Sequence, residues 1–425
     1  MLLEILDYIN YVFYGLLGLS VFLLGYKVLY HVYGLMPSRK FPDAKKNHSY
    51  AIIIPARYES NVIEALLVSI KNQDYPKELL HTYVIVESEK DPTCEICKRY
   101  PNTEVFVRPN LDKKSKGGAL DQIFQKILVE KKGFEAYFVF DADNILMPTY
   151  ISEMNKTYDA GYKMALAYRN SKNWNDGWVA ACSGVMFSMI NTFQNKARSR
   201  FNSNVVVSGT GFYIAHDVIE NLGGWKFFTL TEDYEISLYA ALNNIKSTYN
   251  EYAEFYDEQP KSLKASWNQR IRWVKGFHQS KGLKKQLMKS ALIDKDNRWS
   301  KLEFGFNVIP ILVPIISIVC YIIVTLGLSL FGWINGMTGY DTAASGAFLA
   351  LIGIYLFFAA YTLSIIMAER KHIDIKFWNA VQAVVMGPLY FALYVPLYFI
   401  ALFKKEVKWK RIDHDVNNET LIKGK

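Results

Sequence analysis

Two acidic patches in the middle of the chain could hold a metal ion and move a proton. Asp141 and Asp143 directly follow the apolar run 136–140, which predicts a strand. Alternate residues of an extended loop share a face, so both carboxylates could reach one ion, and oxygen ligands suit Mg²⁺ or Mn²⁺. Further along, Glu232 or Asp233 could take a proton from a hydroxyl group. The alternatives are a surface turn for the first pair and a helix cap for the second.

An aromatic and cationic cluster follows the second acidic pair. Gln269 and Trp273 are four residues apart, which places them on one face of a helix. Arg272 can neutralise a phosphate, and Trp273 offers a flat apolar surface for a sugar ring. Anchoring by Trp and Arg at a membrane interface would give the same pattern.

Two glycine-containing segments could approach a ligand closely. Lys116, Gly117 and Gly118 open a predicted helix, whose first amides favour anions, so Lys116 is a candidate diphosphate contact. A flexible loop is the alternative. The second segment breaks a predicted strand over 205–213 and contains Ser208, Gly209, Thr210 and Gly211; it predicts close approach to a substrate, or else a tight turn.

Alternating strands and helices should bring these residues together. The predicted strands are 50–55, 82–86, 103–107 and 136–140, and the predicted helices are 62–72 and 119–131. Such alternation predicts a largely parallel α/β sheet, which binds ligands beyond the carboxyl ends of its strands. The loops that carry Arg57, Glu59, Glu87 and Asp141 all fall at that edge.

Both ends of the chain are rich in apolar residues, and 51% of all residues are hydrophobic. Uncharged or nearly uncharged stretches at 8–26, 305–332, 347–367 and 377–403 are long enough to cross a membrane. The basic residues after the first stretch place the globular region in the cytoplasm, at the cell membrane. The net charge of +9 lies mostly beside these stretches, which favours lipid contact and argues against nucleic-acid binding.

Counting crossings places the carboxyl terminus outside, whereas its basic residues argue that it stays inside. Gly387-Pro388 and Pro396 favour a broken final element, which would resolve this conflict. The predicted organisation is an anchor with a basic linker (1–45), a globular domain (46–283), an amphipathic interface helix or plain linker (284–303), a membrane region (304–404) and a basic tail (405–425).

The motifs as a set resemble those of the membrane-embedded, family-two inverting glycosyltransferases, such as cellulose, hyaluronan and poly-N-acetylglucosamine synthases. Asp141-Ala142-Asp143 resembles the metal-binding DxD motif, Thr231-Glu232-Asp233 the TED motif, and Gln269 with Arg272 and Trp273 the QxxRW motif. Lys116-Gly117-Gly118 is similar to the donor-side segment, and Ser208–Gly211 to the acceptor-side loop. Glu87 stands where the family usually has an aspartate that contacts the uracil.

The resemblance implies a GT-A, Rossmann-like catalytic domain on a transmembrane helical bundle, with Asp233 as the catalytic base. It implies a metal-dependent enzyme (Mg²⁺ or Mn²⁺) that polymerises a UDP-hexose, most simply UDP-glucose, into an exported β-glucan. The donor would contact Arg57, Glu59, Glu87, Lys116, Asp141, Gln269 and Arg272, and the acceptor would contact Trp273 and the Ser208–Thr210 loop. Transfer of one sugar to a membrane lipid is the alternative, and export could require a second copy or an accessory subunit.

Overall fold

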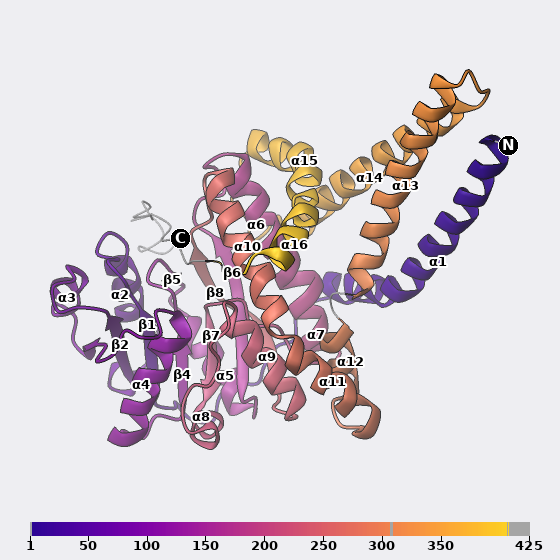
Figure 1. Ribbon diagram of the computed structural model, residues 1–425. Coiled ribbons are helices and arrows are strands. Elements are labelled where there is room, and N and C mark those ends of the chain that lie inside the picture. The colour runs from indigo at the N-terminus through magenta and orange to yellow at the C-terminus, as the bar shows by residue number, and fades with distance from the viewer. Residues whose placement is uncertain (1, 307–308, 406, 408–425) are drawn as a thin grey trace.

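An eight-stranded mixed sheet forms the centre of the globular region (Figure 1). The computed structural model describes residues 2–306, 309–405 and 407. The strand order is β3-β2-β1-β4-β7-β6-β8-β5. The strands are β1 (Tyr50–Pro55), β2 (Leu80–Val86), β3 (Thr103–Val107), β4 (Ala136–Val139), β5 (Ile145–Leu146), β6 (Met164–Ser171), β7 (Phe212–Ala215) and β8 (Ser247–Asp257).

Strand direction decides which loops meet. β3, β2, β1 and β4 are parallel, as predicted, and β6 and β8 are parallel to each other. β7 is antiparallel to both β4 and β6. The carboxyl ends of β1, β2, β4, β6 and β8 therefore share one edge with the start of β7. The largely parallel sheet predicted from the sequence is correct for the first half, but the second half is mixed.

Helices cover both faces of the sheet because successive strand residues point to opposite sides. Ile52 and Ile54 pack in one apolar cluster with α2 and α5, whereas Ala51 and Ile53 pack in the other with α4 and α9. The helices of the globular region are α2 (Ile63–Lys71), η1 (Lys77–Leu79), α3 (Thr93–Cys97), α4 (Lys116–Glu130), α5 (Tyr150–Asp159), α6 (Trp178–Ile190), the π-helix η2 (Asn191–Lys196), α7 (Ala197–Arg200), α8 (His216–Leu222), α9 (Glu232–Leu242) and α10 (Leu263–Gln279).

The predicted strand over 205–213 is largely wrong. Only Phe212 and Tyr213 belong to β7, and the residues before them form a loop. Gly211 has a positive φ of 66°, and a Cβ at this position would lie 2.0 Å from the ring of Phe255. The glycine is therefore required by packing against β8.

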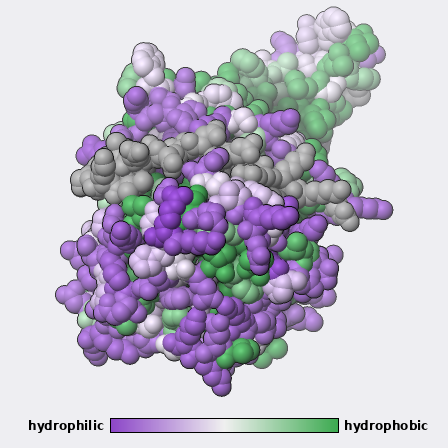
Figure 2. All heavy atoms as spheres, turned by 90° about the vertical axis from the view of Figure 1, so that its left-hand side faces the viewer, coloured by the Kyte–Doolittle hydropathy of each residue, from purple (hydrophilic) through white to green (hydrophobic). Residues whose placement is uncertain are grey.

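Three long helices form an arm that projects from the globular region, with the amino terminus at its far end (Figure 1). They are α1 (Leu2–Leu35), α13 (Ile309–Ile334) and α14 (Tyr340–Glu369). Within the described residues, four helical segments are long and apolar enough to cross a membrane: Leu3–Leu35, Ile316–Ile334, Tyr340–Glu369 and Phe377–Phe403. Large apolar side chains such as Phe22 and Leu349 are exposed on the arm. Figure 2 shows the same contrast, with a largely hydrophobic arm behind a mostly hydrophilic globular surface.

The last membrane segment is broken, as the sequence predicts. It forms α15 (Phe377–Ala392) and α16 (Tyr394–Phe403), which lie over the globular region beside α6 and α10 (Figure 1). The break lies at Leu393. Pro396, three residues later, falls in the first turn of α16, where a missing N–H costs little. Pro388 stays inside α15, so Gly387-Pro388 is not the breakpoint. Gly387 instead lets α15 approach Thr362 of α14, since a Cβ there would lie 2.7 Å from its Oγ1.

The segment 284–303 does not form one helix. It is divided between α11 (Lys281–Ile293) and α12 (Arg298–Phe306), which pack against each other and against α9. Leu287 and Phe304 are buried with Tyr234 and Leu238. Part of the apolar surface that predicted an interface helix therefore faces protein, while Leu292 and Trp299 remain exposed. The predicted domain boundaries remain predictions, and most of the basic tail (405–425) lies outside the described residues.

Candidate active site

Asp141 and Asp143 lie in a tight turn between β4 and β5. The predicted extended loop is wrong, since the N–H of Asn144 donates to the carbonyl of Asp141 at 3.1 Å and closes the turn. The Asp141 side chain is 39% exposed, whereas Asp143 is buried and accepts the N–H of Glu258 at 3.2 Å. The turn therefore presents one open carboxylate and one that is fixed by the residue directly after β8.

Lys116 begins α4 and reaches the same turn. Its Nζ donates to Oδ1 of Asp141 at 2.5 Å and to the carbonyl of Gly209 at 2.8 Å. Ser115 caps the helix by accepting the N–H of Gly118 at 3.1 Å. A Cβ at Gly117 would lie 2.2 Å from the carbonyl oxygen of Phe227, so this glycine is required by contact with the chain itself, whereas the sequence suggested only approach to a ligand.

Glu232 and Asp233 lie in the first turn of α9, directly after the N-cap residue Thr231, so neither is the helix cap that was the alternative. Burial raises the pKa of Glu232 to about 7, and the charge of Asp233 adds to this while Lys116 opposes it. Burial also raises the pKa of Asp233, against the N–H of Tyr234 and the charge of Lys116. Glu232 is buried and Asp233 is half-buried, and a carboxylate whose pKa is raised can hold or accept a proton.

Helix α10 carries Gln269, Arg272 and Trp273, all partly buried. It approaches the start of α9 so closely that a Cβ on Gly276 would lie 2.2 Å from Oγ1 of Thr231. On its other side, Arg270 is fully buried and donates to the carbonyl of Tyr390, next to the break in the last membrane segment. The helix therefore joins the acidic pair to α15 and α16.

The charges of these segments act on one another. Burial lowers the pKa of Arg272, and the carboxylates of Glu232, Asp141 and Asp233 oppose that effect. Burial likewise disfavours the charged form of Lys116, but the same three carboxylates outweigh it and raise its pKa. Two cations and three carboxylates from four different elements thus share one site at the carboxyl edge of the sheet.

A second cluster of charged side chains lies beside the carboxyl ends of β1 and β2. The Nε of Arg57 is 2.9 Å from Oε2 of Glu87, and Nη1 of Arg108 is 3.8 Å from Oε1 of the same carboxylate. Glu59 lies in the loop after β1, where its N–H donates to Oγ1 of Thr93 at 3.1 Å. Arg57 and Glu87 were selected from the sequence; Arg108, which follows β3, was missed and is buried.

The loop before β7 lies against both acidic segments. A Cβ on Gly209 would lie 3.7 Å from Oδ2 of Asp233, so this backbone borders the acidic pair. Thr210 accepts the N–H of Asp141 on Oγ1 at 2.9 Å, and its hydroxyl donates to Asn144. The carbonyl of Ser208 accepts from Nη1 of Arg169 at 2.8 Å. Asn144 and Arg169 were missed because single polar residues at strand ends carry no spacing signal.

The carboxylate oxygens of this turn suit a divalent ion whose coordination shell is completed by the substrate. Within the described residues, no group of three or more His, Cys, Asp and Glu side chains is arranged to hold a metal. Asp141 and Asp143 supply two carboxylates on one turn. Mg²⁺ commonly binds through one or two carboxylates together with waters and substrate phosphates, so the residues fit such an ion.

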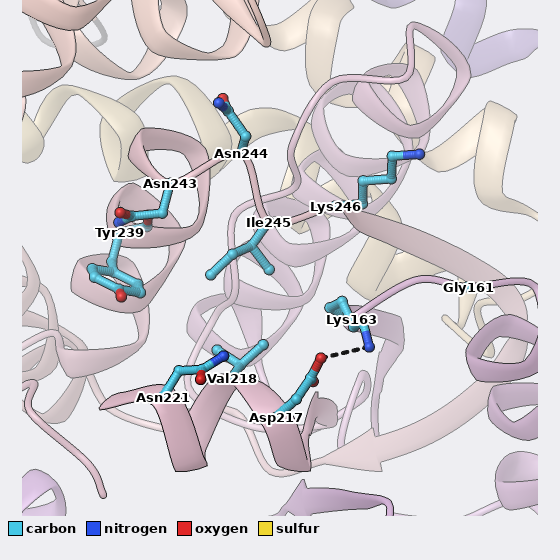
Figure 3. Close-up of a pocket in the computed structure, with 10 residues that line it drawn as sticks. All are labelled: Gly161, Lys163, Asp217, Val218, Asn221, Tyr239, Asn243, Asn244, Ile245 and Lys246. Atoms are coloured by element: carbon cyan, nitrogen blue, oxygen red, sulfur yellow. Dashed lines mark hydrogen bonds and ion pairs between the residues drawn. The ribbon is translucent and has the colours of Figure 1, made fainter. Parts of the chain in front are cut away.

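A hollow at the opposite edge of the sheet contains none of these residues. It is lined by segments that precede β6 and β8 and follow β7, including Lys163 and Asp217, which form an ion pair at 2.6 Å (Figure 3). Since the strand ends that carry the acidic groups lie at the other edge, this hollow is not part of the candidate site.

Comparison with known proteins assigns the family. The family described as glycosyltransferase like family 2 matches residues 47–276 of the 425-residue chain. The chain is a family 2 glycosyltransferase. This region runs from just before β1 to Gly276 of α10, so it includes every site residue described above.

Relatives of this glycosyltransferase differ in their named activities. The probable glycosyltransferase YdaM of Bacillus subtilis (strain 168) is 25% identical and covers 93% of this chain and 96% of its own. The beta-monoglucosyldiacylglycerol synthase of Trichormus variabilis is 24% identical, over 61% of this chain and 57% of the synthase. The poly-beta-1,6-N-acetyl-D-glucosamine synthase of Staphylococcus epidermidis is 19% identical, over 64% and 65%.

Among solved structures, the mannosyltransferase PcManGT from Pyrobaculum calidifontis, in complex with GDP-Man and Mn²⁺, has a TM-score of 0.50 at 15% sequence identity. The match covers 93% of this glycosyltransferase and 99% of PcManGT. At that identity the likeness establishes the fold, a GT-A-like domain with a mixed sheet; the GT-A fold was expected from the sequence, whereas the antiparallel β7 was not.

Proposed function

We propose that the protein is a metal-dependent, inverting β-glycosyltransferase that takes a hexose from a UDP-sugar, with UDP-glucose as the first candidate. The observation that carries this proposal is the convergence of Lys116, Asp141, Glu232, Asp233 and Arg272 at one edge of the sheet. A diphosphate leaving group needs cations beside it, and an attacking hydroxyl needs a base. Both kinds of group lie together here.

In the proposed reaction, Lys116 and Arg272 offset the charge that grows on the departing nucleotide diphosphate. Asp233 accepts the proton of the acceptor hydroxyl as its oxygen attacks the anomeric carbon from the opposite side. One displacement inverts that carbon and gives a β-linkage. A divalent ion held by Asp141 and Asp143 would supply further positive charge to the diphosphate.

We assign the nucleotide end of the donor to the group around Glu87. The two guanidinium groups of Arg57 and Arg108 flank its carboxylate and fix its position. An ionised carboxylate can accept an N–H, as a pyrimidine ring offers. Glu59 on the neighbouring loop and Gln269 on α10 are the remaining proposed donor contacts.

We propose that successive transfers build an exported polysaccharide, most simply a β-glucan, with Trp273 and the Ser208–Thr210 loop against the acceptor. The globular domain would lie in the cytoplasm at the cell membrane. A poly-beta-1,6-N-acetyl-D-glucosamine synthase among the relatives supports a polymer product. The helices of the arm are mostly exposed in one copy, so a path for a chain would require a second copy or a partner subunit.

That same exposure favours a second candidate, the transfer of one sugar to a membrane lipid. A lipid acceptor needs no enclosed path, and α10 packs directly against α16, so an acceptor could reach Trp273 from the bilayer. Three beta-monoglucosyldiacylglycerol synthases among the relatives support this candidate.

Product size separates the two candidates. The purified chain is reconstituted in liposomes containing dioleoylglycerol and supplied with Mn²⁺ and radiolabelled UDP-glucose. A polymer synthase gives a β-glucanase-sensitive product that stays at the origin of a lipid chromatogram. A single labelled lipid that extracts into chloroform rejects the polymer and supports the second candidate. Absence of any labelled product, with this and other UDP-hexoses, rejects both.

A further inference from the structure

Arg169, near the end of β6, has a buried guanidinium group that contacts three parts of the candidate site. Its Nε lies 2.9 Å from Oδ2 of Asp257, and its Nη2 donates to the same oxygen. Its Nη1 donates to the carbonyl of Ser208 at 2.8 Å. Its flat face lies over the ring of Phe187, with Cζ 3.8 Å from the ring centroid.

Through Asp257, Arg169 is connected to the turn that carries Asp141 and Asp143. Oδ1 of Asp257 accepts from Nδ2 of Asn144 at 2.9 Å. Asn144 in turn accepts the N–H of Asp141 at 3.2 Å and the hydroxyl of Thr210. One carboxylate thus connects Arg169 to the turn that carries both candidate metal ligands.

The contact with Phe187 leads to Trp273. Phe187 belongs to α6, and its ring meets the indole of Trp273 edge to face, with centroids 5.9 Å apart and an interplanar angle of 84°. Such edge-to-face pairs have a preferred geometry, so a fixed Phe187 ring restricts the orientation of the indole. The guanidinium of Arg169 lies over the face of the same ring and helps to keep it in place.

We infer that Arg169 is a positioning residue for the acceptor: it sets the Ser208–Thr210 loop and, through Phe187, the Trp273 indole at a fixed separation. This inference rests on the proposed function, in which the loop and the indole contact the acceptor. The geometry requires a planar cation whose donors reach both Asp257 and Ser208 while its flat face covers the ring of Phe187. Lysine could keep the charge beside Asp257, but it has no flat face for Phe187 and no rigid fork that also reaches Ser208.

Arg169→Lys therefore tests the inference. We expect the ratio of transferred glucose to free glucose released into water to fall about tenfold, since a loop hydrogen bond and a cation–π contact are lost together. The KM for UDP-glucose and the rate of Mn²⁺-dependent UDP release without acceptor should stay close to those of the wild type. With cellotetraose or dioleoylglycerol as added acceptor, its KM should rise by a similar factor while kcat changes little.

Arg99→Lys is the matched control, because Arg99 is an exposed arginine on the surface near α3 that pairs with Glu64. A second variant, Phe187→Leu, removes the ring contact and leaves Asp257 and Ser208 paired with Arg169. It should raise the acceptor KM in the same direction by a smaller factor, because the hydrogen bond to the loop remains, and it keeps the test valid if Arg169→Lys does not fold.

The outcomes separate this inference from the proposed function. A wild-type protein that transfers no sugar overturns both. If the wild type transfers sugar, an unchanged transfer ratio and acceptor KM in both variants overturns only the role of Arg169. A rise in the KM for UDP-glucose with an unchanged acceptor KM also overturns it, since that would place Arg169 on the donor side.

Discussion

The Nζ of Lys116 lies 2.5 Å from Oδ1 of Asp141, and the same ammonium donates to the carbonyl of Gly209. One side chain thus joins the start of α4, the turn after β4 and the loop before β7. It also places a positive charge beside the carboxylate that is most open to solvent in that turn. The donor side and the acceptor side of the proposed site therefore depend on one lysine.

Lys116→Met should weaken UDP binding by about tenfold or more, because a charge-assisted contact with phosphate contributes roughly 1.5–3 kcal/mol. The measurement is isothermal titration of the purified protein with UDP in the presence of Mn²⁺. Lys114→Met is the control, since Lys114 is an exposed lysine two residues away. Equal affinities in the wild type and in Lys116→Met would show that Lys116 does not contact the diphosphate.

Gly276→Ala should separate α10 from α9. The added Cβ would lie 2.2 Å from Oγ1 of Thr231, and overpacking of this kind costs about 1–3 kcal/mol of stability. Transfer activity should fall further than stability, because Arg272 and Trp273 move with α10 relative to Asp233. Thermal melts and turnover measured side by side check this. Gly282→Ala has nothing within 4 Å of its Cβ and should leave both unchanged.

The raised pKa of Glu232 makes the folding stability of the protein depend on pH. The folded protein holds this proton up to about pH 7, whereas an ordinary glutamate loses it near 4.5. The unfolded chain therefore binds fewer protons between these values, and stability falls as the pH rises through this window, by up to about 3 kcal/mol. Glu232→Gln removes that loss.

We accordingly expect Glu232→Gln to melt at a higher temperature than the wild type at pH 8 and at nearly the same temperature at pH 5. The measurement is a series of thermal melts in detergent without metal or donor. Glu95→Gln, at an exposed glutamate, serves as the control. A Glu232→Gln variant that is less stable than the wild type at pH 8 would contradict the assignment.

Removal of divalent ions should abolish transfer, because the carboxylates of Asp141 and Asp143 repel a nucleotide diphosphate when no metal ion lies between them. EDTA treatment followed by Mg²⁺ or Mn²⁺ tests this, with Ca²⁺ as a comparison. Asp143→Asn should raise the metal concentration needed for half-maximal rate by more than tenfold, because a carboxylate ligand is lost. Full activity in EDTA would exclude the metal role of Asp141 and Asp143.

Much of the site could be predicted because its residues follow strands whose order fixes where they meet. Apolar runs such as 50–55 and 136–140 predict strands, and parallel strands place the residues that follow them, including Arg57, Glu87 and Asp141, at one edge. Lys116, Glu232, Asp233 and Arg272 were found through short motifs, and the structure brings all four to the same edge.

Other features depend on contacts between distant segments and leave no local pattern. Gly211 is required because a Cβ there would clash with the ring of Phe255, and Gly276 because a Cβ there would clash with Thr231. Neither spacing nor composition reveals these roles. Arg169 occupies an ordinary strand position, and its importance appears only when Asp257, Ser208 and Phe187 are placed around it. Leu287 of α11 was assigned to the membrane interface because a sequence cannot distinguish burial against α9 from burial in a membrane.

The most direct test of the account is the behaviour of Asp233→Asn with UDP-glucose and Mn²⁺. The asparagine keeps the shape of the side chain and cannot take a proton, so kcat should fall by about 10²–10⁴-fold. The affinity for UDP, measured by titration, should stay within about threefold of the wild type, and Asp217→Asn at the opposite edge of the sheet should change neither quantity. Undiminished turnover in Asp233→Asn would contradict the central claim that this carboxylate activates the acceptor hydroxyl.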